Sequence, residues 1–359
     1  MTQNMRKSAT SQVPRSISNR PEASPQSAAA DWVTMSLLSE TPRASTSAKR
    51  RSSAGRRALN AVVVAASLVL AVVIVLHNLV PDVGGLGLVI DSAAPWLGLG
   101  IPVLLVLAAF ARRGRPWVAA LVPLVAWVLM FGTSIIPLKW TAPPASATTL
   151  TVASQNVEAS SGTGAASAAD LVATGAQVVA IQEMDAASRT EISSVLDATY
   201  EYSYQVGTVG LWSSYPILNA QPWDLGLGWQ RALAADLETP EGLVSIYVIH
   251  AASARIGDHA DRDEMLKNLA NVLPNDENDR VIAVGDFNAA STDRAFKPIL
   301  SQLSEPNQSD GLFGFTWPAS PFPVTRLDHF LQRGLDVISN TVIPAGGSDH
   351  LAIVATVNL

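Results

Sequence analysis

The sequence predicts three transmembrane helices followed by an α/β domain, in which two packed mixed sheets are flanked by helices. Two observations lead to this prediction. Three long uncharged apolar runs lie between residues 58 and 136, whereas short strand-like runs separated by helical patterns fill the rest of the chain. Charge is also uneven, because residues 1–140 carry 14 Lys and Arg against 5 Asp and Glu, and residues 141–359 carry 10 against 25. The two parts of the chain therefore differ in kind, although the formal net charge is only −6.

Residues 1–57 precede the apolar runs and are rich in Ser, Ala, Arg, Gln and Pro, with few large apolar side chains. Such a segment cannot bury enough apolar surface to offset the entropy lost on ordering. We therefore expect a disordered cytoplasmic tail.

Three apolar runs, over residues 58–76, 93–111 and 117–136, are each long enough for a helix that crosses about 30 Å of hydrocarbon. Pro102 and Pro123 are compatible with such helices, because neighbouring helices can satisfy the freed backbone groups. One run could be a buried helix or a cleaved signal, but three in succession predict a membrane domain over residues 58–140.

The orientation of this membrane domain follows from its basic residues. One group precedes the first run: Lys49, Arg50, Arg51, Arg56 and Arg57. Arg112, Arg113 and Arg115 fill the turn between the second and third runs, whereas the loop over residues 77–92 contains Asp82 and Asp91 and no Lys or Arg. Since basic residues stay on the cytoplasmic side, the N-terminus and this turn are predicted to be cytoplasmic. Three spans then place residues 141–359 outside the cell membrane.

A tract rich in Pro, Ala, Ser and Thr over residues 141–149 predicts a short linker, after which residues 150–359 suffice for one domain. Helical patterns occupy residues 165–175 and 258–273. Seven runs with apolar centres are typical of strands: 150–157, 176–184, 242–250, 280–288, 325–334, 336–344 and 350–359. Because hairpin-like and helix-linked strands are mixed, we expect two packed sheets with helices outside.

Polar residues recur at or near the ends of these strand-like runs: Asn156, Glu183, His250, Asp286, Asn288, Asp328, Asp349 and His350. In "VIAVGDFNAA" the carboxylate of Asp286 and the amide of Asn288 are two residues apart, so they point to the same side of an extended chain. A plain turn would also accept both residues. Ligand sites in α/β domains gather where strand ends and their loops converge, which favours a site.

The residue types in this series indicate a binding site for a divalent cation. Glu183, Asp286 and Asp349 offer carboxylate oxygens, and Asn156 and Asn288 offer amide oxygens, which suits Mg²⁺ or Mn²⁺. The chain has no cysteine, which excludes disulfides, thiolate metal sites and a cysteine nucleophile.

A histidine beside carboxylates adds acid–base chemistry to this set. Asp328 could orient the imidazole of His350 and raise its pKa, so that His350 interacts with a water or a phosphoryl oxygen.

Seven segments, in this order, resemble the endonuclease/exonuclease/phosphatase superfamily: "LTVASQNV", "VVAIQEM", "GLWSSYPI", "YVIHAAS", "VIAVGDFNAA", "RLDHFL" and "SDHLAIVATV". The resemblance covers residues 148–359, and "GDFN" together with "SDH" is its most specific part. It implies a four-layer α/β sandwich. Together with the predicted membrane domain, it implies a membrane-anchored, divalent-metal-dependent phosphoesterase that hydrolyses a phosphodiester or phosphomonoester by in-line attack of water, with Mg²⁺, or Mn²⁺, as the cofactor.

The resemblance also assigns a metal side of the site. It implies that Glu183 is the principal metal ligand, with Asn156 beside it and Asp349 contributing.

The resemblance assigns five catalytic residues. It implies that Asp286 positions or activates the attacking water, and that Asn288 holds the phosphate and supports Asp286. His350 is implied to contact the scissile phosphate with Asp328 as its partner. His250 corresponds to a second histidine that stabilises the developing negative charge.

Several alternatives remain open. The substrate could be a lipid headgroup beside the bilayer, or DNA cleaved by an extracytoplasmic endonuclease, although an acidic domain without a basic arm argues against avid DNA binding. A catalytically silent, membrane-tethered binding module is a third reading, disfavoured because every motif residue is present. His250 could instead be structural, and Arg231 is expected to form a cross-strand ion pair rather than to reach a substrate phosphate. Beyond the bilayer and the substrate, no protein partner is predicted.

Overall fold

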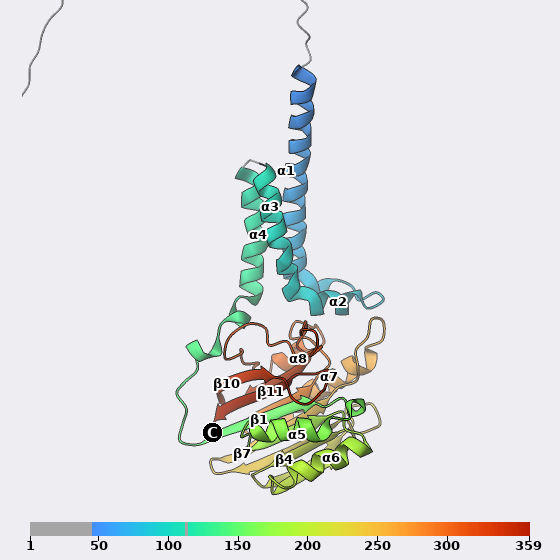
Figure 1. Ribbon diagram of the computed structural model, residues 1–359, viewed down its shortest axis with the longest axis vertical. Helices are drawn as coiled ribbons and strands as arrows, with labels where there is room; N and C mark the ends of the chain where they lie inside the picture. The colour runs from blue at the N-terminus through green and yellow to red at the C-terminus, as the bar shows by residue number, and fades with distance from the viewer. Residues whose placement is uncertain (1–44, 112–113) are drawn as a thin grey trace, which may run out of the picture. The chain divides into compact units, whose positions relative to one another are not determined.

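The computed structural model describes residues 45–111 and 114–359 (Figure 1). Most of the tail for which disorder is expected, residues 1–44, lies outside the described residues. The same holds for Arg112 and Arg113 of the predicted cytoplasmic turn.

The three apolar runs form helices: α1 (Ser45–Leu76), α2 (Leu86–Ala93) with the 3-10 helix η2 (Ala94–Leu99) and α3 (Gly100–Ala111), and α4 (Gly114–Phe131). Three helical segments, Ser53–Leu79, Leu86–Ala111 and Gly114–Phe131, are long and apolar enough to cross a membrane. Large apolar side chains are exposed along them, including Val69 at 62% and Leu129 at 76%, as expected of surfaces that face lipid. Three candidate spans are thus confirmed, and their orientation stays a prediction.

The membrane helices differ from the prediction at their ends. The second begins at Leu86 rather than residue 93, because α2 and η2 continue the helix toward the N-terminus. The third ends at Phe131, after which the chain forms two short 3-10 helices, η3 (Thr133–Ile135) and η4 (Leu138–Trp140). A further 3-10 helix, η1 (His77–Leu79), extends α1.

Eleven strands of the described residues form two mixed sheets. One has the order β10-β11-β1-β2-β4-β3 and the other β5-β6-β7-β8-β9. The strands are β1 (Thr149–Asn156), β2 (Val178–Gln182), β3 (Tyr202–Val206), β4 (Val209–Ser213), β5 (Ile217–Trp223), β6 (Ala232–Thr239), β7 (Gly242–His250), β8 (Val281–Asp286), β9 (Asp328–Arg333), β10 (Asp336–Ile343) and β11 (Ala352–Asn358). Pairing is parallel for β1–β2 and β7–β8 and antiparallel elsewhere.

Successive side chains of each strand point to opposite faces of its sheet, and the two sheets pack face to face through one set of these side chains. Val152 and Leu211 from one sheet share a buried core with Ile246, Val284 and Phe330 from the other. The alternate residues of the same strands point outward into two further cores.

Helices cover both outer faces of the sheets. The six-stranded sheet packs against α5 (Gly164–Ala173) and α6 (Ala186–Leu196), and the five-stranded sheet against α7 (Ala260–Val272) and α8 (Lys297–Leu300). The order of layers is therefore helix, sheet, sheet, helix, which confirms the predicted four-layer sandwich (Figure 1). All seven predicted strands are present, together with β3 to β6.

Candidate active site

Strand register brings three of the predicted residues into one row. His250 ends β7 and pairs in register with Asp286 at the end of β8, and Asp286 pairs with Asp328 at the start of β9. From the facing sheet, Asn156 ends β1 and His350 lies just before β11. The predicted site residues therefore meet at one end of the sandwich, where the edges of both sheets converge.

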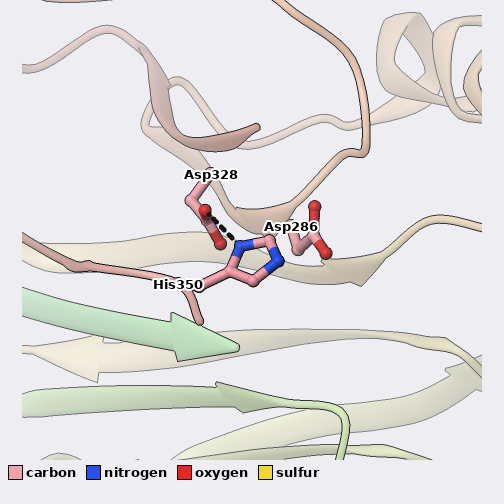
Figure 2. Close-up of side chains that lie close together, drawn as sticks. All are labelled: Asp286, Asp328 and His350. Carbon is pink, nitrogen blue, oxygen red and sulfur yellow. Dashed lines mark hydrogen bonds and ion pairs between the residues drawn. The ribbon is translucent and has the colours of Figure 1, made fainter. Parts of the chain in front are cut away.

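The centre of the site is a buried group formed by Asp286, Asp328 and His350. Nδ1 of His350 lies 2.7 Å from Oδ2 of Asp328, and Figure 2 shows the imidazole ring between the two carboxylates. One ligand atom from each residue lies within 4.8 Å of the others, so the group could hold a metal ion. The partnership predicted between Asp328 and His350 is present.

This arrangement favours the imidazolium form of His350. Burial lowers the pKa of His350, but the negative charges of Asp328 and Asp286 outweigh burial and raise it to about 10. Since Nδ1 faces Asp328, it carries a proton, and Nε2 is the nitrogen available to other groups. A cation bound by all three residues would compete with these protons.

Asp286 is held in a fixed orientation by three donors. Its carboxylate accepts from the backbone N of Asn288 at 2.8 Å, from Nδ2 of Asn288 at 3.0 Å and from Nδ2 of Asn156 at 2.9 Å. Burial raises the pKa of Asp286 to about 6, with His350 opposing the rise and Asp328 adding to it. The carboxylate is thus mostly ionised near neutral pH, yet close enough to its pKa to accept a proton.

The backbone of "GDFN" explains why this sequence forms the strand tip. Gly285 has a φ of 133°, and a Cβ there would lie 2.1 Å from the carbonyl oxygen of Ile249, so only glycine fits. Asn288 adopts a φ of 48°, which Asn tolerates better than most residues. Nδ2 of Asn288 also donates to the carbonyl of Ala251, which ties the turn to the end of β7.

Glu183 and Asp349 form the more exposed side of the site. Their side chains are 43% and 47% exposed, and Oε2 of Glu183 accepts from Nδ2 of Asn156 at 2.8 Å. Oδ2 of Asp349 accepts from Nε1 of Trp317 at 3.0 Å. Accessible carboxylate oxygens at the edge of the buried Asp286–Asp328–His350 group fit a hard divalent cation such as Mg²⁺.

Asn156 is oriented differently from the other predicted ligands. Its Oδ1 accepts from the backbone N of Glu158 at 3.0 Å, and its Nδ2 donates to both Glu183 and Asp286. The side chain therefore links the two carboxylates and directs its amino group toward them. Its role as a metal ligand stays a prediction.

His250 is enclosed by two polar partners. Nε2 lies 2.6 Å from Nη2 of Arg231, and Nδ1 lies 3.0 Å from Oγ1 of Thr208. Since a guanidinium can only donate, Nε2 must accept, and Nδ1 carries the proton. Burial and the charges of Arg231 and His350 hold the pKa of His250 well below its usual value, so the ring is neutral.

Arg231 precedes β6 and does not form the expected cross-strand ion pair among the described residues. It donates instead to the ring of His250 and to the backbone carbonyls of His250 and Ala251, and its guanidinium lies over the ring of Trp229. The ion-pair expectation was wrong because the cross-strand partner of Arg231 on β7 is the imidazole of His250 rather than a carboxylate. Sequence reasoning also missed Thr208, which lies in the tight β3–β4 turn and belongs to no recognisable motif.

The sequence pattern of the Endonuclease/Exonuclease/phosphatase family matches residues 153–350, which is more than half of the chain. The chain belongs to this family. The match includes all eight predicted site residues, from Asn156 to His350. Comparison with the sequences of characterised proteins gave no match.

Solved structures of similar chains extend this comparison. A β toxin variant from Staphylococcus aureus with bound magnesium ions is 19% identical, covering 58% of this chain and 99% of that one, with a TM-score of 0.46. A protein of the endonuclease/exonuclease/phosphatase family from Leptotrichia buccalis is 18% identical, covering 58% and 100%, with a TM-score of 0.45. Another member, from Bacteroides thetaiotaomicron, is 14% identical, covering 60% and 96%, with a TM-score of 0.48.

Proposed function

We propose that this protein is a membrane-anchored, divalent-metal-dependent phosphoesterase that hydrolyses a phosphate ester by in-line attack of water. The observation that carries the proposal is the buried Asp328–His350–Asp286 group beside the accessible carboxylates of Glu183 and Asp349. A structural role alone would not require two buried carboxylates on either side of one imidazole, since burying charge is costly.

Glu183 and Asp349 would hold the cation, Mg²⁺ or Mn²⁺, with Asn156 keeping Glu183 in place. When bound, such a cation neutralises negative charge on the phosphate and on the leaving oxygen. The donor set supports this role because it consists of oxygen atoms at a half-exposed edge.

Asp286 would orient the attacking water and accept its proton. Its two oxygens are fixed by Asn156 and Asn288, so the lone pair directed at the water does not have to reorganise during attack. His350, protonated and held by Asp328, would donate from Nε2 to a nonbridging phosphate oxygen. Asn288 would contact the same phosphate.

Arg231 would stabilise the developing negative charge, and His250 would position the guanidinium for this role. Because the ring is neutral and its Nε2 accepts from Arg231, His250 keeps the guanidinium at the edge of the site. The positive charge of Arg231 then lies close enough to act on a phosphate.

We further propose that the substrate is a phosphoester close to the membrane surface, such as a lipid headgroup, and that the catalytic domain is extracytoplasmic. The adjacent apolar helices and the acidic balance of residues 141–359 support this substrate class over DNA.

Hydrolysis by the full-length protein in a mild detergent tests the proposal. The substrates are bis-p-nitrophenyl phosphate, mixed phospholipid and sphingolipid vesicles, and plasmid DNA, each with Mg²⁺ or with EDTA. Asp286→Asn and His350→Ala are compared with Asp261→Asn, a carboxylate that is exposed on α7.

We expect metal-dependent hydrolysis that Asp286→Asn and His350→Ala each lower by about two orders of magnitude or more, with Asp261→Asn unchanged. Hydrolysis of vesicles but not of plasmid would support a lipid headgroup, and the reverse would support an endonuclease. A folded protein without activity on any of these substrates would argue for a silent binding module.

A further inference from the structure

Hydrogen bonds join the end of the membrane segment to the loop that follows the "GDFN" turn. Asp91 of α2 is fully buried, and its carboxylate accepts from Nε of Arg294 at 2.6 Å, from the backbone N of Arg294 at 3.1 Å and from Nδ1 of His77 at 2.9 Å. Oγ1 of Thr292 donates to the backbone carbonyl of Asp91 at 2.6 Å. The segment around residues 290–294 therefore lies against the membrane helices.

A cavity of about 80 Å³ lies at this boundary. Its membrane-side wall includes Ser92, Phe131 and Ser134, and its domain-side wall includes Ser291 and Arg326. A water molecule occupies about 30 Å³ of liquid volume, so the cavity has room for two or three waters or for one tetrahedral oxyanion.

Two residues of the cavity wall carry a buried donor atom that has no hydrogen-bond partner among the described residues. Arg326 is 5% exposed; its Nε lies in an ion pair with Glu305, whereas its Nη2 forms no hydrogen bond within the described residues. Oγ1 of Thr325, another lining residue, is likewise buried without a partner in the described part of the chain. Because buried polar groups are nearly always hydrogen-bonded, the unpaired Nη2 of Arg326 and the unpaired hydroxyl of Thr325 beside the same cavity indicate a missing acceptor.

Glu305 lines the same cavity and forms an ion pair with Nε of Arg326. Its Oε1 accepts from Nδ1 of His329 and lies 3.2 Å from Nε of Arg326. This contact leaves Nη2 of Arg326 unpaired among the residues that the structure describes. Since Asp328 and His329 are neighbours on β9, their side chains leave opposite faces of the strand, which separates this cavity from the Asp328–His350 pair.

We infer that this cavity binds a phosphate group, which accepts from Nη2 of Arg326 and from Oγ1 of Thr325. A guanidinium matches the oxygen spacing of phosphate better than any other side chain. The phosphate has two possible sources, a phospholipid headgroup of the adjoining leaflet and free inorganic phosphate.

The surroundings are compatible with a lipid. Phe313 and Phe315 also line the cavity and stack on each other with centroids 5.4 Å apart. Trp96 stacks on Phe315, is 37% exposed, and donates from Nε1 to the carbonyl of Val324. Tryptophans with one polar contact are typical of the membrane–water interface, the depth at which lipid phosphates lie.

The first arm of the test measures free phosphate. Full-length wild type, Arg326→Gln, Thr325→Val and Arg280→Gln are titrated with inorganic phosphate in detergent and EDTA, and thermal unfolding is followed. EDTA suppresses metal-dependent binding at the catalytic group. Arg280 is the matched control, because it is a partly exposed arginine outside the cavity wall that donates to the carbonyl of Glu241.

The second arm measures lipid. The same four proteins are incubated with phosphatidylglycerol, or with diacylglycerol, which lacks the phosphate, and retained lipid is counted by native mass spectrometry. If Arg326→Gln does not fold, Thr325→Val still tests the inference, because this substitution removes only the hydroxyl of the side chain.

We expect Arg326→Gln to raise the Kd for phosphate, or for phosphatidylglycerol, by about tenfold or more, and Thr325→Val to raise it by about threefold, with Arg280→Gln unchanged. Loss confined to the lipid arm identifies a headgroup, and loss confined to the phosphate arm identifies the free ion. Equal behaviour of all folded variants in both arms would overturn the inference and leave a cavity that holds water.

Discussion

Replacing Asp328 by asparagine removes the negative charge that contributes most to keeping His350 protonated. The pKa of His350 is raised to about 10 from an ordinary 6.5, although burial opposes the rise. At about 1.4 kcal/mol per pH unit, a shift of this size is worth at most about 5 kcal/mol, shared among three carboxylates. The amide oxygen introduced by Asp328→Asn would still accept from Nδ1 of His350. We therefore expect the variant to lower the free energy of unfolding by about 2–3 kcal/mol near neutral pH.

The stabilisation should depend on pH in a defined direction. A histidine whose pKa is higher in the folded state than in the unfolded state contributes fully below about pH 6.5, and its contribution is lost as the pH rises toward 10. In Asp328→Asn the pKa of His350 lies closer to its ordinary value, so little of this contribution remains to be lost. The difference between wild type and variant should therefore shrink by about 2 kcal/mol or more between about pH 7 and pH 9.

Denaturant unfolding of the full-length protein in detergent and EDTA, followed by tryptophan fluorescence, measures this difference at both pH values. The exposed Asp261→Asn variant reports any general effect of removing one acidic charge. A stability difference that is the same at both pH values would refute the assignment of His350 as an imidazolium paired with Asp328.

Three further predictions concern the backbone, the second histidine and the metal. Gly285→Ala should lower the free energy of unfolding, measured with denaturant, by about 3 kcal/mol or more, because the new Cβ would lie 2.1 Å from a backbone carbonyl oxygen. Gly242→Ala is the control: its φ is 110° but no atom lies near the new Cβ, so it should lower the free energy of unfolding by only about 1–2 kcal/mol. Equal losses would contradict the steric argument. Arg231→Met should raise the pKa of His250 toward its ordinary value, because it removes a nearby positive charge, and an unchanged titration of the His250 ring by NMR would disprove that cause. Glu183→Gln should lower metal-dependent hydrolysis by about a hundredfold and weaken Mg²⁺ binding, while the exposed Glu191→Gln should do neither; equal Mg²⁺ affinity in both variants would argue against Glu183 as a ligand.

Burial explains only part of the difference between the strands that were predicted and those that were missed, because the missed β4 is buried at every position and the missed β6 at most of its positions. β2 and β8 are buried at every position, so their sequences are continuous apolar runs that are easily found in the sequence. β3 is a short edge strand with no fully buried residue, and β5 is mostly exposed. The sequences of β3 and β5 therefore lack a continuous apolar run, and these strands are recognised only from their pairing with neighbouring strands in the structure.

The sequence by itself determined the residue types at the strand ends, the membrane helices and the two packed sheets with helices outside, because each depends on local composition and short spacing, and the family resemblance added the four-layer sandwich. Only the tertiary structure decided which atoms meet. Asn156 reaches Asp286 across 130 positions of the chain, and His350 meets Asp328 across 22, because two sheets pack with their ends converging. The direction of the Asn156 amide, the neutral ring of His250 and the unpaired Nη2 of Arg326 among the described residues follow from packing between distant segments, which local sequence does not encode.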